Sequence, residues 1–505
     1  MLIHEAFFLF IPMKSITLKN ISKSFLGKTL FEDVSFSVQK GDRIAITGKN
    51  GAGKSTLLKI IIGTEDSDAG RVLKEKVSCR YVPQEFSGDQ TLSIMEYLDS
   101  TGDTNRVFDV LNQFKVITED QIENSYIQEL SGGQKRVLEI AMVLSHSPMF
   151  LCIDEPENHL DIKSRSVLTD ILRNYWGSVL FVSHDRYLVN QISNKIISIQ
   201  NESAVLLTGK TYEEFVVIEN KNMFAALADW KAEAKALDKL EDTVRMLKAR
   251  TRYNDAQAKT YQMKKRQLEE RKKRLGKRPD QKKDVRIEVE DVKKKNGKLI
   301  FGCSHVQFSY PHSKPILKQV NLDFRFGQRA VLLGRNGSGK TTFIKLLQEI
   351  LKPQAGEVRV GNDIGIQYID QASTLDEDMS PLEHFYNQGY TEEQARSVVA
   401  QFLFTQAEAE SVLKNLSGGQ QQRFTFLFLF KIAPECLVLD EPTNNLDPET
   451  WELLLRLINE FNGSLLLISH DRSFIECMKR KKIWVLSNQT IKESWSDMDE
   501  VLQGL

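Results

Sequence analysis

GKNGAGKST, residues 48–56, is a glycine-rich stretch that follows the apolar run RIAIT (43–47) and leads into the helix-like run KSTLLKIII (54–62). A GxxxxGK[ST] turn between a strand and a helix is a specific signature of phosphate binding. Glycines let backbone N–H groups converge on phosphate oxygens, and the following helix directs the positive end of its dipole there. The stretch therefore predicts an α/β domain that binds a phosphorylated ligand.

The same stretch recurs 286 residues later as GRNGSGKTT (334–342), so that Lys340 corresponds to Lys54. Strand patterns precede an acidic pair and a histidine in each copy and alternate with helical patterns. Each copy is therefore predicted to be a parallel sheet flanked by helices. The other repeated motifs are LSGGQ (130–134 and 416–420), CIDEPENHLD (152–161) with VLDEPTNNLD (438–447), and FVSHDR (181–186) with LISHDR (467–472).

The chain is too long for a single hydrophobic core. Its 505 residues predict two or three domains, and 41% hydrophobic with 27% charged residues is typical of a soluble globular protein. The five cysteines form no CxxC pair, so the sequence suggests neither a disulfide framework nor a zinc site.

The N-terminal apolar run AFFLFI (6–11) is too short to cross a membrane, which takes about 20 residues. No basic segment precedes it, as a secretory signal would require. We therefore expect a cytoplasmic protein without membrane partners. Because MKSITLKNI (13–21) already has the pattern of a strand, we also hypothesise that translation starts at Met13.

The repeated motifs supply residue types that suit phosphoryl transfer with Mg²⁺. The hydroxyl residue after each turn lysine and the aspartate at the end of each strand are expected to hold Mg²⁺. A glutamine at nearly the same distance from each turn is expected to link Mg²⁺ to a small helical subdomain. The candidate metal-binding residues are Ser55, Gln84 and Asp154 in the first copy and Thr341, Gln371 and Asp440 in the second.

A lysine, a glutamate and a histidine in each copy are candidates for the reaction itself. The lysine is expected to neutralise charge in the transition state. The glutamate directly follows the strand-end aspartate, so that one carboxylate serves the metal and the other the attacking water. The histidine is expected to hydrogen-bond the γ-phosphate. The catalytic candidates are Lys54, Glu155 and His184 in the first copy and Lys340, Glu441 and His470 in the second.

With LSGGQ beside both turns, the two copies resemble the ATP-binding-cassette (ABC) ATPase domain over about 420 residues. The resemblance implies ATP as the ligand and a head-to-tail pairing, in which each ATP lies between the turn of one copy and the LSGGQ motif of the other. LSGGQ of the second copy then completes the site of Lys54, and LSGGQ of the first copy completes the site of Lys340. The resemblance also implies that Phe25 and Tyr310 stack on adenine.

The residues expected to bind the nucleotide follow from these motifs. They are Phe25, Gly48, Asn50, Gly51, Gly53, Lys54, Ser55, Thr56, Gln84, Ser131, Gly132 and Gly133 in the first copy, and Tyr310, Gly334, Asn336, Gly337, Gly339, Lys340, Thr341, Thr342, Gln371, Ser417, Gly418 and Gly419 in the second.

One position departs from the repeat, because Glu157 stands where the second copy has Thr443. A carboxylate there adds negative charge near the first site. We hypothesise that the two sites hydrolyse ATP at different rates, which equal single-turnover rates in Glu155→Gln and Glu441→Gln variants would contradict.

A basic segment joins the two copies. Residues 221–300 contain 25 Lys and Arg against 13 Asp and Glu, whereas the rest of the chain contains 43 against 55. Apolar residues at three-four spacing from 223 to 247, and at steps of seven from 261 to 275, predict two antiparallel helices of about 25 residues. The turn between them is expected at NDA (254–256), and the second helix is expected to end at GKRP (276–279).

The charge of this hairpin predicts contact with RNA. Residues 245–283 hold 16 basic and 4 acidic residues, whereas a helix face that is merely solvated interleaves both signs. Such a surface attracts a polyanion through salt-dependent contacts with phosphates. Tyr253 and Tyr261 lie near the bend, where they are placed to stack on unpaired bases.

Two cassettes in one chain, no membrane segment and a charged helical linker of about 80 residues resemble the ABC-F family. The expected fold is α/β, with two ABC-type P-loop ATPase domains (1–218 and 298–505) joined by an antiparallel α-helical hairpin (219–297). The resemblance implies a Mg²⁺-dependent ATPase that acts as a monomer with paired domains. It also implies binding to the ribosome, with the linker pushed toward P-site tRNA, large-subunit rRNA and the peptidyl-transferase region.

Within this family, we expect ribosome protection against antibiotics that bind the large subunit. The interval from Gln84 to Ser131 is 47 residues and that from Gln371 to Ser417 is 46, so the arm insertion of many housekeeping members is absent. One alternative is a housekeeping ABC-F translation factor. Another is the tandem ATPase subunit of an ABC importer, although such a subunit has no use for a long basic hairpin.

Overall fold

Each glycine-rich turn lies between a strand and a helix, as predicted. In the computed structural model, the first turn joins β3 (Arg43–Gly48) to α1 (Lys54–Ile62). The second joins β12 (Arg329–Leu333) to α10 (Lys340–Leu347). The chain forms two compact units, one made of residues 1–208 with 285–505 and the other of residues 209–284.

The structure describes most of the chain, and a few of the predictions fall outside it. The predictions that lie outside concern Met13, Tyr253, Asn254, Leu275, residues 276–279 and Gln371. The described residues are 15–25, 27–48, 50–74, 77–100, 103–200, 202–209, 211–250, 255–274, 292, 297–311, 313–362, 364–369, 375–402, 404–444, 446–494 and 498–504.

A six-stranded sheet forms the centre of each copy. Its strand order is β5-β6-β7-β3-β8-β9 in the first copy and β14-β15-β16-β12-β17-β18 in the second. The first five strands of each order are parallel, and the last is antiparallel, which confirms the predicted parallel sheet. The remaining strands are β5 (Cys79–Val82), β6 (Phe150–Asp154), β7 (Ser178–Val182), β8 (Lys195–Gln200), β9 (Ser203–Thr208), β14 (Ile366–Ile369), β15 (Cys436–Asp440), β16 (Ser464–Ile468), β17 (Lys482–Ser487) and β18 (Thr490–Ser494).

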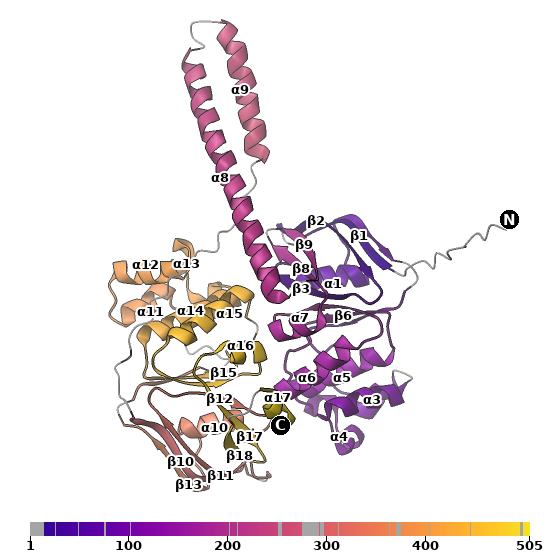
Figure 1. Cartoon of the computed structure of the whole chain (residues 1–505), viewed down its shortest axis with the longest axis vertical. Helices are drawn as coiled ribbons and strands as arrows, with labels where there is room; N and C mark the ends of the chain where they lie inside the picture. The colour runs from indigo at the N-terminus through magenta and orange to yellow at the C-terminus, as the bar shows by residue number, and fades with distance from the viewer. Residues whose placement is uncertain are drawn as a thin grey trace, which may run out of the picture. The chain divides into compact units, whose positions relative to one another are not determined.

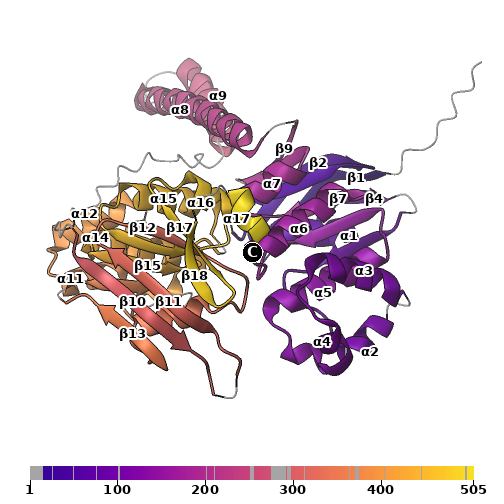
Figure 2. The same cartoon turned by 60° about the horizontal axis from the view of Figure 1, so that its bottom comes forward.

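The apolar runs that predict these strands form the core. Every residue of β6, β7 and β16 is buried. Both faces of a parallel sheet are covered, so its central strands are apolar along their whole length rather than alternating. Figure 2 shows helices flanking the sheets of both copies. These covered sheets hold the motif residues, which follow the carboxyl ends of the strands.

Each copy also contains a three-stranded antiparallel sheet that the sequence did not predict. Its order is β2-β1-β4 in the first copy and β11-β10-β13 in the second, and irregular register interrupts the pairing of β1 and β10. The three strands of the second copy lie side by side in Figure 2. The strands are β1 (Ser15–Phe25), β2 (Lys28–Gln39), β4 (Ala69–Lys74), β10 (Leu299–Phe308), β11 (Leu317–Arg325) and β13 (Ala355–Val360).

A group of short helices separates the predicted glutamine position from the strand-end aspartate in each copy. The signature helices α5 and α14 begin directly after Ser131 and Ser417, which cap them in boxes with Gln134 and Gln420. The helices of the first copy are α2 (Ile94–Asp99), α3 (Thr104–Phe114), α4 (Glu119–Asn124), η1 (Ile127–Glu129), α5 (Gly132–Ser145), α6 (Ile162–Arg173) and α7 (Arg186–Ile192). Those of the second are α11 (Pro381–Asn387), α12 (Glu392–Gln401), α13 (Gln406–Glu410), η3 (Leu413–Asn415), α14 (Gly418–Ile432), α15 (Pro448–Glu460), α16 (Arg472–Cys477) and α17 (Met498–Gly504).

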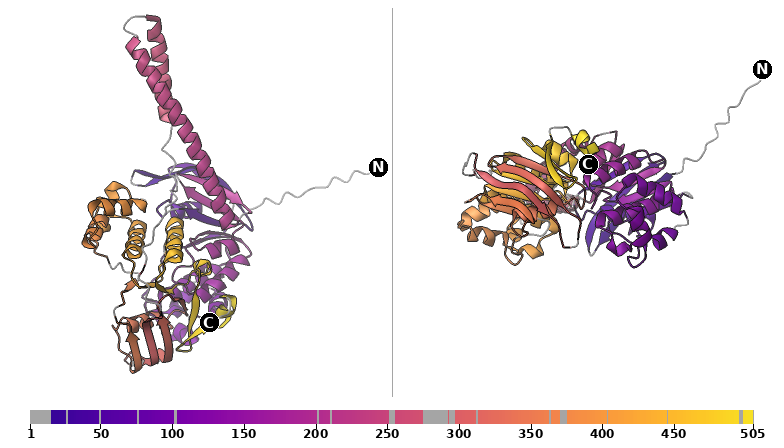
Figure 3. Two further views of the ribbon diagram at one scale, coloured as in Figure 1. Left: turned by 60° about the vertical axis from the view of Figure 1, so that its left-hand side comes forward. Right: turned by 90° about the horizontal axis from the view of Figure 1, so that it is seen from below.

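The linker is a helical hairpin, as predicted, but its helices differ in length from the prediction. α8 (Tyr212–Arg250) has 39 residues and α9 (Asp255–Arg274) has 20, against about 25 for each. α8 begins earlier because Thr211 and Glu214 form a capping box, and it runs through the predicted domain boundary at 218. Figure 1 and the left view of Figure 3 show the two helices side by side.

Apolar and ionic contacts hold the two linker helices together. Leu237 of α8 and Leu268 of α9 are both buried, in agreement with the predicted apolar seam. Arg271 lies 3.8 Å from Glu233 and Lys272 lies 2.9 Å from Glu241, so both ion pairs join the helices. Within the described part of the chain, no helix has the length and apolar character that a membrane span requires.

Candidate active site

The helix that follows each glycine-rich turn begins at a glycine in the left-handed region. Gly53 has φ 92° and Gly339 has φ 105°. A Cβ at Gly53 would lie 3.0 Å from the ring of Phe31, and one at Gly339 would lie 2.4 Å from Ile316. Both the backbone conformation and the available space therefore require glycine. These constraints leave the first N–H groups of α1 and α10 directed into the turn, where an anion can bind.

The two turn lysines are buried beside the backbone of their own turns. Lys54 Nζ donates to Gly48 O at 3.0 Å, and Lys340 Nζ donates to Gly334 O at 2.7 Å. Burial lowers the pKa of Lys54 to about 8 and also lowers the pKa of Lys340. The remaining predicted residues of the two turns and first helical turns are Asn50, Gly51, Ser55, Thr56, Asn336, Gly337, Thr341 and Thr342.

The glutamates after the strand-end aspartates share an unusual backbone conformation. Glu155 has φ 46° and Glu441 has φ 51°, both in the left-handed region that non-glycine residues seldom adopt. The N–H of Glu155 donates to Val182 O at 2.9 Å, and that of Glu441 donates to Ile468 O at 2.8 Å. A neighbouring strand thus holds each glutamate where the chain leaves the sheet. Strain of this kind is concentrated at functional sites.

The aspartates that end β6 and β15 contact hydroxyl groups. Asp154 accepts a hydrogen bond from the Tyr81 hydroxyl at 3.1 Å, and Asp440 lies 3.5 Å from Thr341 Oγ1. The Thr341 hydroxyl and the Asp440 carboxylate offer oxygen ligands of the kind that Mg²⁺ prefers. Gln84, the third metal candidate of the first copy, instead donates to Glu155 at 2.8 Å.

The two catalytic candidates of the acidic motif have different partners. Glu155 Oε2 accepts from Gln84 and from Asn158, the latter at 2.6 Å. Glu441 Oε2 accepts the backbone N–H of His470 at 3.3 Å, and Glu441 Oε1 lies 3.3 Å from His470 Nε2. Burial raises the pKa of both carboxyl groups, that of Glu441 to about 7.

The two histidines also have different surroundings. His470 Nδ1 accepts the backbone N–H of Ile162 at 3.3 Å, a contact between the two copies. Among the described residues, the ring nitrogens of His184 have no hydrogen-bond partner. Burial lowers the pKa of His184 to about 3 and that of His470 well below its usual value, so both rings are neutral near pH 7.

The structure brings the first signature motif to the second glycine-rich turn. A cleft of about 800 Å³ is lined by Ser131 and Gly133 on one side and by residues 335–338 on the other. The backbone N–H of Asn336 donates to Asp161 at 3.1 Å, and the Asn336 side chain donates to His159 O at 2.9 Å. The predicted pairing of Ser131 and Gly133 with the loop of Lys340 therefore has a geometric basis.

Fewer contacts support the predicted pairing of the second LSGGQ motif with the first glycine-rich turn. Ser417 contacts Gln420 of its own helix, and a Cβ at Gly419 would lie 3.4 Å from Asp447 of the same copy. The negative charge of Asp447 favours the protonated form of Lys54 and so raises its pKa, against the larger effect of burial. The placement of Ser417, Gly418 and Gly419 beside Lys54 stays a prediction.

The two predicted adenine-stacking residues are accessible. The side chain of Phe25 is 63% exposed, and that of Tyr310 is 38% exposed. Tyr310 packs edge-on against Phe308, with ring centroids 5.1 Å apart. Aromatic rings of this size are usually buried, so their exposure is compatible with a stacking role.

Comparisons with known proteins place both copies in one family. A family model described as ABC transporter matches residues 31–158 and 317–444. The chain is 31% identical to the ATP-binding protein Uup of Buchnera aphidicola subsp. Acyrthosiphon pisum, over 97% of this chain and 83% of that protein. It is 27% identical to ABC transporter F family member 5 of Arabidopsis thaliana, over 93% and 75%, respectively. The chain belongs to the ABC-F family.

This ABC-F protein is an ATPase, and each copy is an ABC cassette that binds ATP, as predicted. Another relative is the ribosome protection protein VmlR of Bacillus subtilis, which is 30% identical over 96% of this chain and 88% of that protein. The alignments with Uup and with VmlR each span at least 96% of this chain, so they cover the linker as well as the two cassettes.

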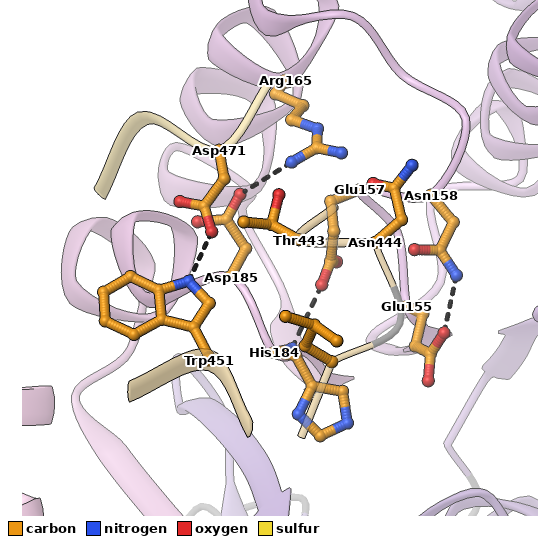
Figure 4. Close-up of a pocket in the computed structure, with 11 residues that line it drawn as sticks. Glu155, Glu157, Asn158, Arg165, His184, Asp185, Thr443, Asn444, Trp451 and Asp471 are labelled. Atoms are coloured by element: carbon orange, nitrogen blue, oxygen red, sulfur yellow. Dashed lines mark hydrogen bonds and ion pairs between the residues drawn. The ribbon is translucent and has the colours of Figure 1, made fainter. Parts of the chain in front are cut away.

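Polar side chains connect the two cassettes of the ABC-F chain beside the histidines. A small cavity of about 30 Å³ is lined by residues of both cassettes, including Arg165 and Trp451, which occupy equivalent positions. Arg165 lies 3.4 Å from Asp185, and Trp451 Nε1 donates to Asp471 at 2.6 Å. Figure 4 shows Asp185 and Asp471 next to each other. Their proximity, together with burial, raises the pKa of Asp471.

The arginines after the two histidines reach across to the opposite cassette. The Arg186 guanidinium lies 3.8 Å from the ring centroid of Trp451 and forms a 2.9 Å ion pair with Glu452. Arg472 lies 4.5 Å from the ring centroid of Tyr187 and donates to its hydroxyl at 3.2 Å. Cation–π contacts of this kind stabilise by about 0.5–2 kcal/mol each. The cassettes of the ABC-F chain therefore contact each other through the arginines that end the motifs FVSHDR and LISHDR, to which the sequence alone assigned no role.

Arg136 is a further residue that the motif search missed. It is buried on the signature helix of the first cassette, and its guanidinium donates to Asp154 O at 2.6 Å and to Glu155 O at 3.1 Å. It also donates to Pro83 O and lies 3.5 Å from Glu139. One side chain thus ties the signature helix to the backbone of both acidic residues. The equivalent residue of the second cassette is Gln422, so the repeat gave no signal.

We expect Arg136→Gln to lower the free energy of unfolding by about 3–5 kcal/mol, because it removes a buried cation that pairs with Glu139 and donates to three backbone carbonyl groups. Denaturant unfolding of the intact chain measures the effect. Arg266→Gln is the matched control, because Arg266 is exposed and pairs with Glu270 one helical turn away. That variant should change the free energy by no more than about 0.5 kcal/mol. Equal shifts in both variants would contradict the proposed role of Arg136.

Proposed function

We propose that this ABC-F ATPase is a cytoplasmic protein that binds the ribosome and directs its linker toward P-site tRNA, large-subunit rRNA and the peptidyl-transferase region. We further propose that it protects the ribosome against antibiotics of the large subunit. The basic hairpin between the two cassettes carries the proposal. Similarity to VmlR, named as a ribosome protection protein, supports it over 96% of the chain.

Exposed basic side chains lie on both helices of the linker, where they can contact the phosphates of an RNA backbone. Lys265 and Arg266 are exposed on α9, and their partners Glu269 and Glu270 lie one turn along the same helix. Exposed ion pairs of this kind contribute at most about 1 kcal/mol, so phosphate groups can compete for the basic partner. Lys235, Lys239 and Arg245 are exposed on α8. The hairpin can therefore make many weak, sequence-independent phosphate contacts.

The second composite site is the better assembled place for ATP. The Lys340 loop, the signature residue Ser131 and Asp161 line or border one cleft, which is large enough for a nucleotide. Lys340 and the N-terminus of α10 would neutralise phosphate charge, and Ser131 would contact the γ-phosphate from the other cassette. Glu441 would accept the proton of the attacking water. Neutral His470 would donate a hydrogen bond from Nε2 to the γ-phosphate.

Mg²⁺ is proposed as the metal cofactor. Ser55 with Asp154, and Thr341 with Asp440, would hold it in the two sites, with Gln84 and Gln371 as further ligands. When bound, the ion would neutralise charge between the β- and γ-phosphates.

The direct test of this function is ATP-dependent binding to ribosomes. Purified protein should sediment with ribosomes in the presence of ATP, and this binding should fall steeply as salt increases, because phosphate contacts dominate it. ATP hydrolysis without preference for ribosomes over lipid vesicles would contradict the proposal. Cofractionation with a membrane permease would instead favour the importer subunit.

The protective role needs a separate measurement in cells. Expression in a susceptible bacterium should raise the inhibitory concentrations of drugs that bind the large subunit. Ribosome binding with unchanged inhibitory concentrations for every such drug would instead indicate a housekeeping translation factor. A variant that cannot hydrolyse ATP serves as the control for expression itself.

A further inference from the structure

The two cassettes differ at two positions that contact the histidine loops. Glu157 of the first cassette corresponds to Thr443 of the second, and Ile162 corresponds to Pro448. Each pair is separated by 286 residues, like the motifs themselves. Both differences change the hydrogen-bonding capacity of the residue, because proline has no N–H and threonine has no carboxylate.

In the second site, the histidine is held from two sides. Its Nδ1 accepts the N–H of Ile162 from the first cassette, at 3.3 Å. A neutral ring whose Nδ1 accepts must carry its proton on Nε2, which lies 3.3 Å from Glu441 Oε1. The backbone N–H of His470 also donates to Glu441. The contact with Ile162 therefore fixes the ring and its tautomer, and the backbone N–H of His470 holds the catalytic glutamate beside the ring.

In the first site, the equivalent contacts cannot form in the same way. Pro448 occupies the position of Ile162 and offers no N–H to His184. The backbone N–H of His184 donates to Glu157 Oε1 at 3.2 Å rather than to the catalytic glutamate, as Figure 4 shows. Glu155 is bound by the side-chain amides of Gln84 and Asn158 instead.

Glu157 is buried and contacts the loop that carries His184. Its side chain is buried, and its Oε1 also accepts from Ser183 Oγ at 2.7 Å. Ser183 Oγ in turn accepts the N–H of Asp185 at 3.0 Å. In the second cassette, Thr443 Oγ1 contacts Ser469 Oγ at 3.0 Å and takes no part in holding His470 N–H. One carboxylate oxygen therefore fixes the loop from residue 183 to 185.

We propose that Glu157 is a positioning residue that holds the His184 loop of the first site in place of the contacts that fix His470 in the second. The first site is thereby the slower of the two, because no group among the described residues hydrogen-bonds the ring of His184, and because Glu155 accepts hydrogen bonds from two side-chain amides. This inference rests on the proposed roles of Glu155 and His184 in ATP hydrolysis.

Single-turnover ATP hydrolysis in variants with one working site tests the proposal. Glu441→Gln leaves the first site to be measured, and Glu155→Gln leaves the second. With wild-type Glu157, the first site should hydrolyse more slowly than the second. Adding Glu157→Ala should slow the first site about tenfold and leave the second within about twofold, since a displaced reactive group loses rate in the site that it serves.

Two further variants separate positioning from general stability. Glu157→Gln keeps an oxygen that accepts from Ser183 and His184, so it should restore the rate of the first site. Pro448→Ile supplies a backbone N–H at the position equivalent to Ile162, whose own N–H contacts His470. The new N–H can contact His184 in the same way, so this variant should partly rescue Glu157→Ala. Thr443→Ala is the matched control in the second cassette and should leave the first site unchanged.

The outcomes distinguish this inference from the proposed catalytic roles. Equal rates of the two sites, or equal slowing of both by Glu157→Ala, would overturn the positioning role. If Glu157→Ala does not fold, Glu157→Gln still decides, because a first site slowed by Glu157→Gln also overturns the positioning role. Undiminished hydrolysis in the double variant Glu155→Gln with Glu441→Gln would instead show that the catalytic assignment itself is wrong.

Discussion

Replacing both catalytic glutamates, Glu155→Gln with Glu441→Gln, should reduce ATP turnover at least about 100-fold and leave ATP binding intact. Loss of a general base typically costs about 10²–10⁴-fold in rate. Glutamine preserves the shape of the side chain, and the backbone of both residues is held by neighbouring strands rather than by the carboxylate. The variant should therefore keep the closed, ATP-bound arrangement of the cassettes.

On ribosomes, the same double variant should stay bound and halt translation. ATP would continue to join the cassettes, and the step that normally releases the protein would be blocked. Phosphate release and ribosome sedimentation in ATP measure the two effects. Glu349→Gln is a suitable control, since Glu349 is also a left-handed glutamate, with φ 59°, but is exposed after α10. Normal cycling of the double variant would show that the assigned glutamates are not the bases.

The features that could be predicted from sequence are those set by local patterns. Both glycine-rich turns and the central strands lie where their motifs and apolar runs place them. β3 begins at Arg43, as the predicted run RIAIT (43–47) does, and ends one residue beyond it, because a buried central strand needs continuous apolar side chains. The strand pattern at MKSITLKNI (13–21) overlaps β1, but the two small antiparallel sheets were not predicted, since their strands are half-exposed and irregular register interrupts their pairing.

Contacts between the cassettes could not be predicted, because they depend on tertiary placement. Pro448 is visible in the sequence, but its meaning requires knowing that Ile162 N–H contacts a histidine 308 residues away. Glu157 departs from the repeat, and the sequence alone predicts only that it adds negative charge near the first site. The structure places it under the histidine loop, where its hydrogen bonds are the larger consequence.

The start of α8 shows the opposite case, in which a local signal was present but not used. Thr211 to Glu214 has the S/T-x-x-E pattern of a capping box, yet the linker was predicted to begin at 219. The apolar spacing that predicts the helix starts at residue 223, whereas α8 itself begins at Tyr212. The length of α8 therefore could have been predicted from the sequence.

Reversing the charge of Arg271, Lys272, Lys273 and Arg274 to glutamate should weaken ribosome binding by about 100-fold or more at moderate salt. The slope of the logarithm of the binding constant against the logarithm of the salt concentration should also become less steep, by about 1 for each lost phosphate contact and by up to about 4 in total. Sedimentation with ribosomes across a series of salt concentrations measures both quantities. Unchanged binding would mean that this run is only a solvated face of the hairpin.

The hairpin contacts complicate this experiment and also supply its control. Arg271 and Lys272 pair with Glu233 and Glu241 across the hairpin, so reversal places like charges opposite each other and opposes the pairing of α8 with α9. Exchanging one pair, Arg271→Glu with Glu233→Arg, keeps the ion pair and the net charge of the linker. If net positive charge drives binding, this exchange should retain the wild-type salt dependence. A large loss in the exchanged variant would instead show that one α9 position recognises a specific feature of the RNA.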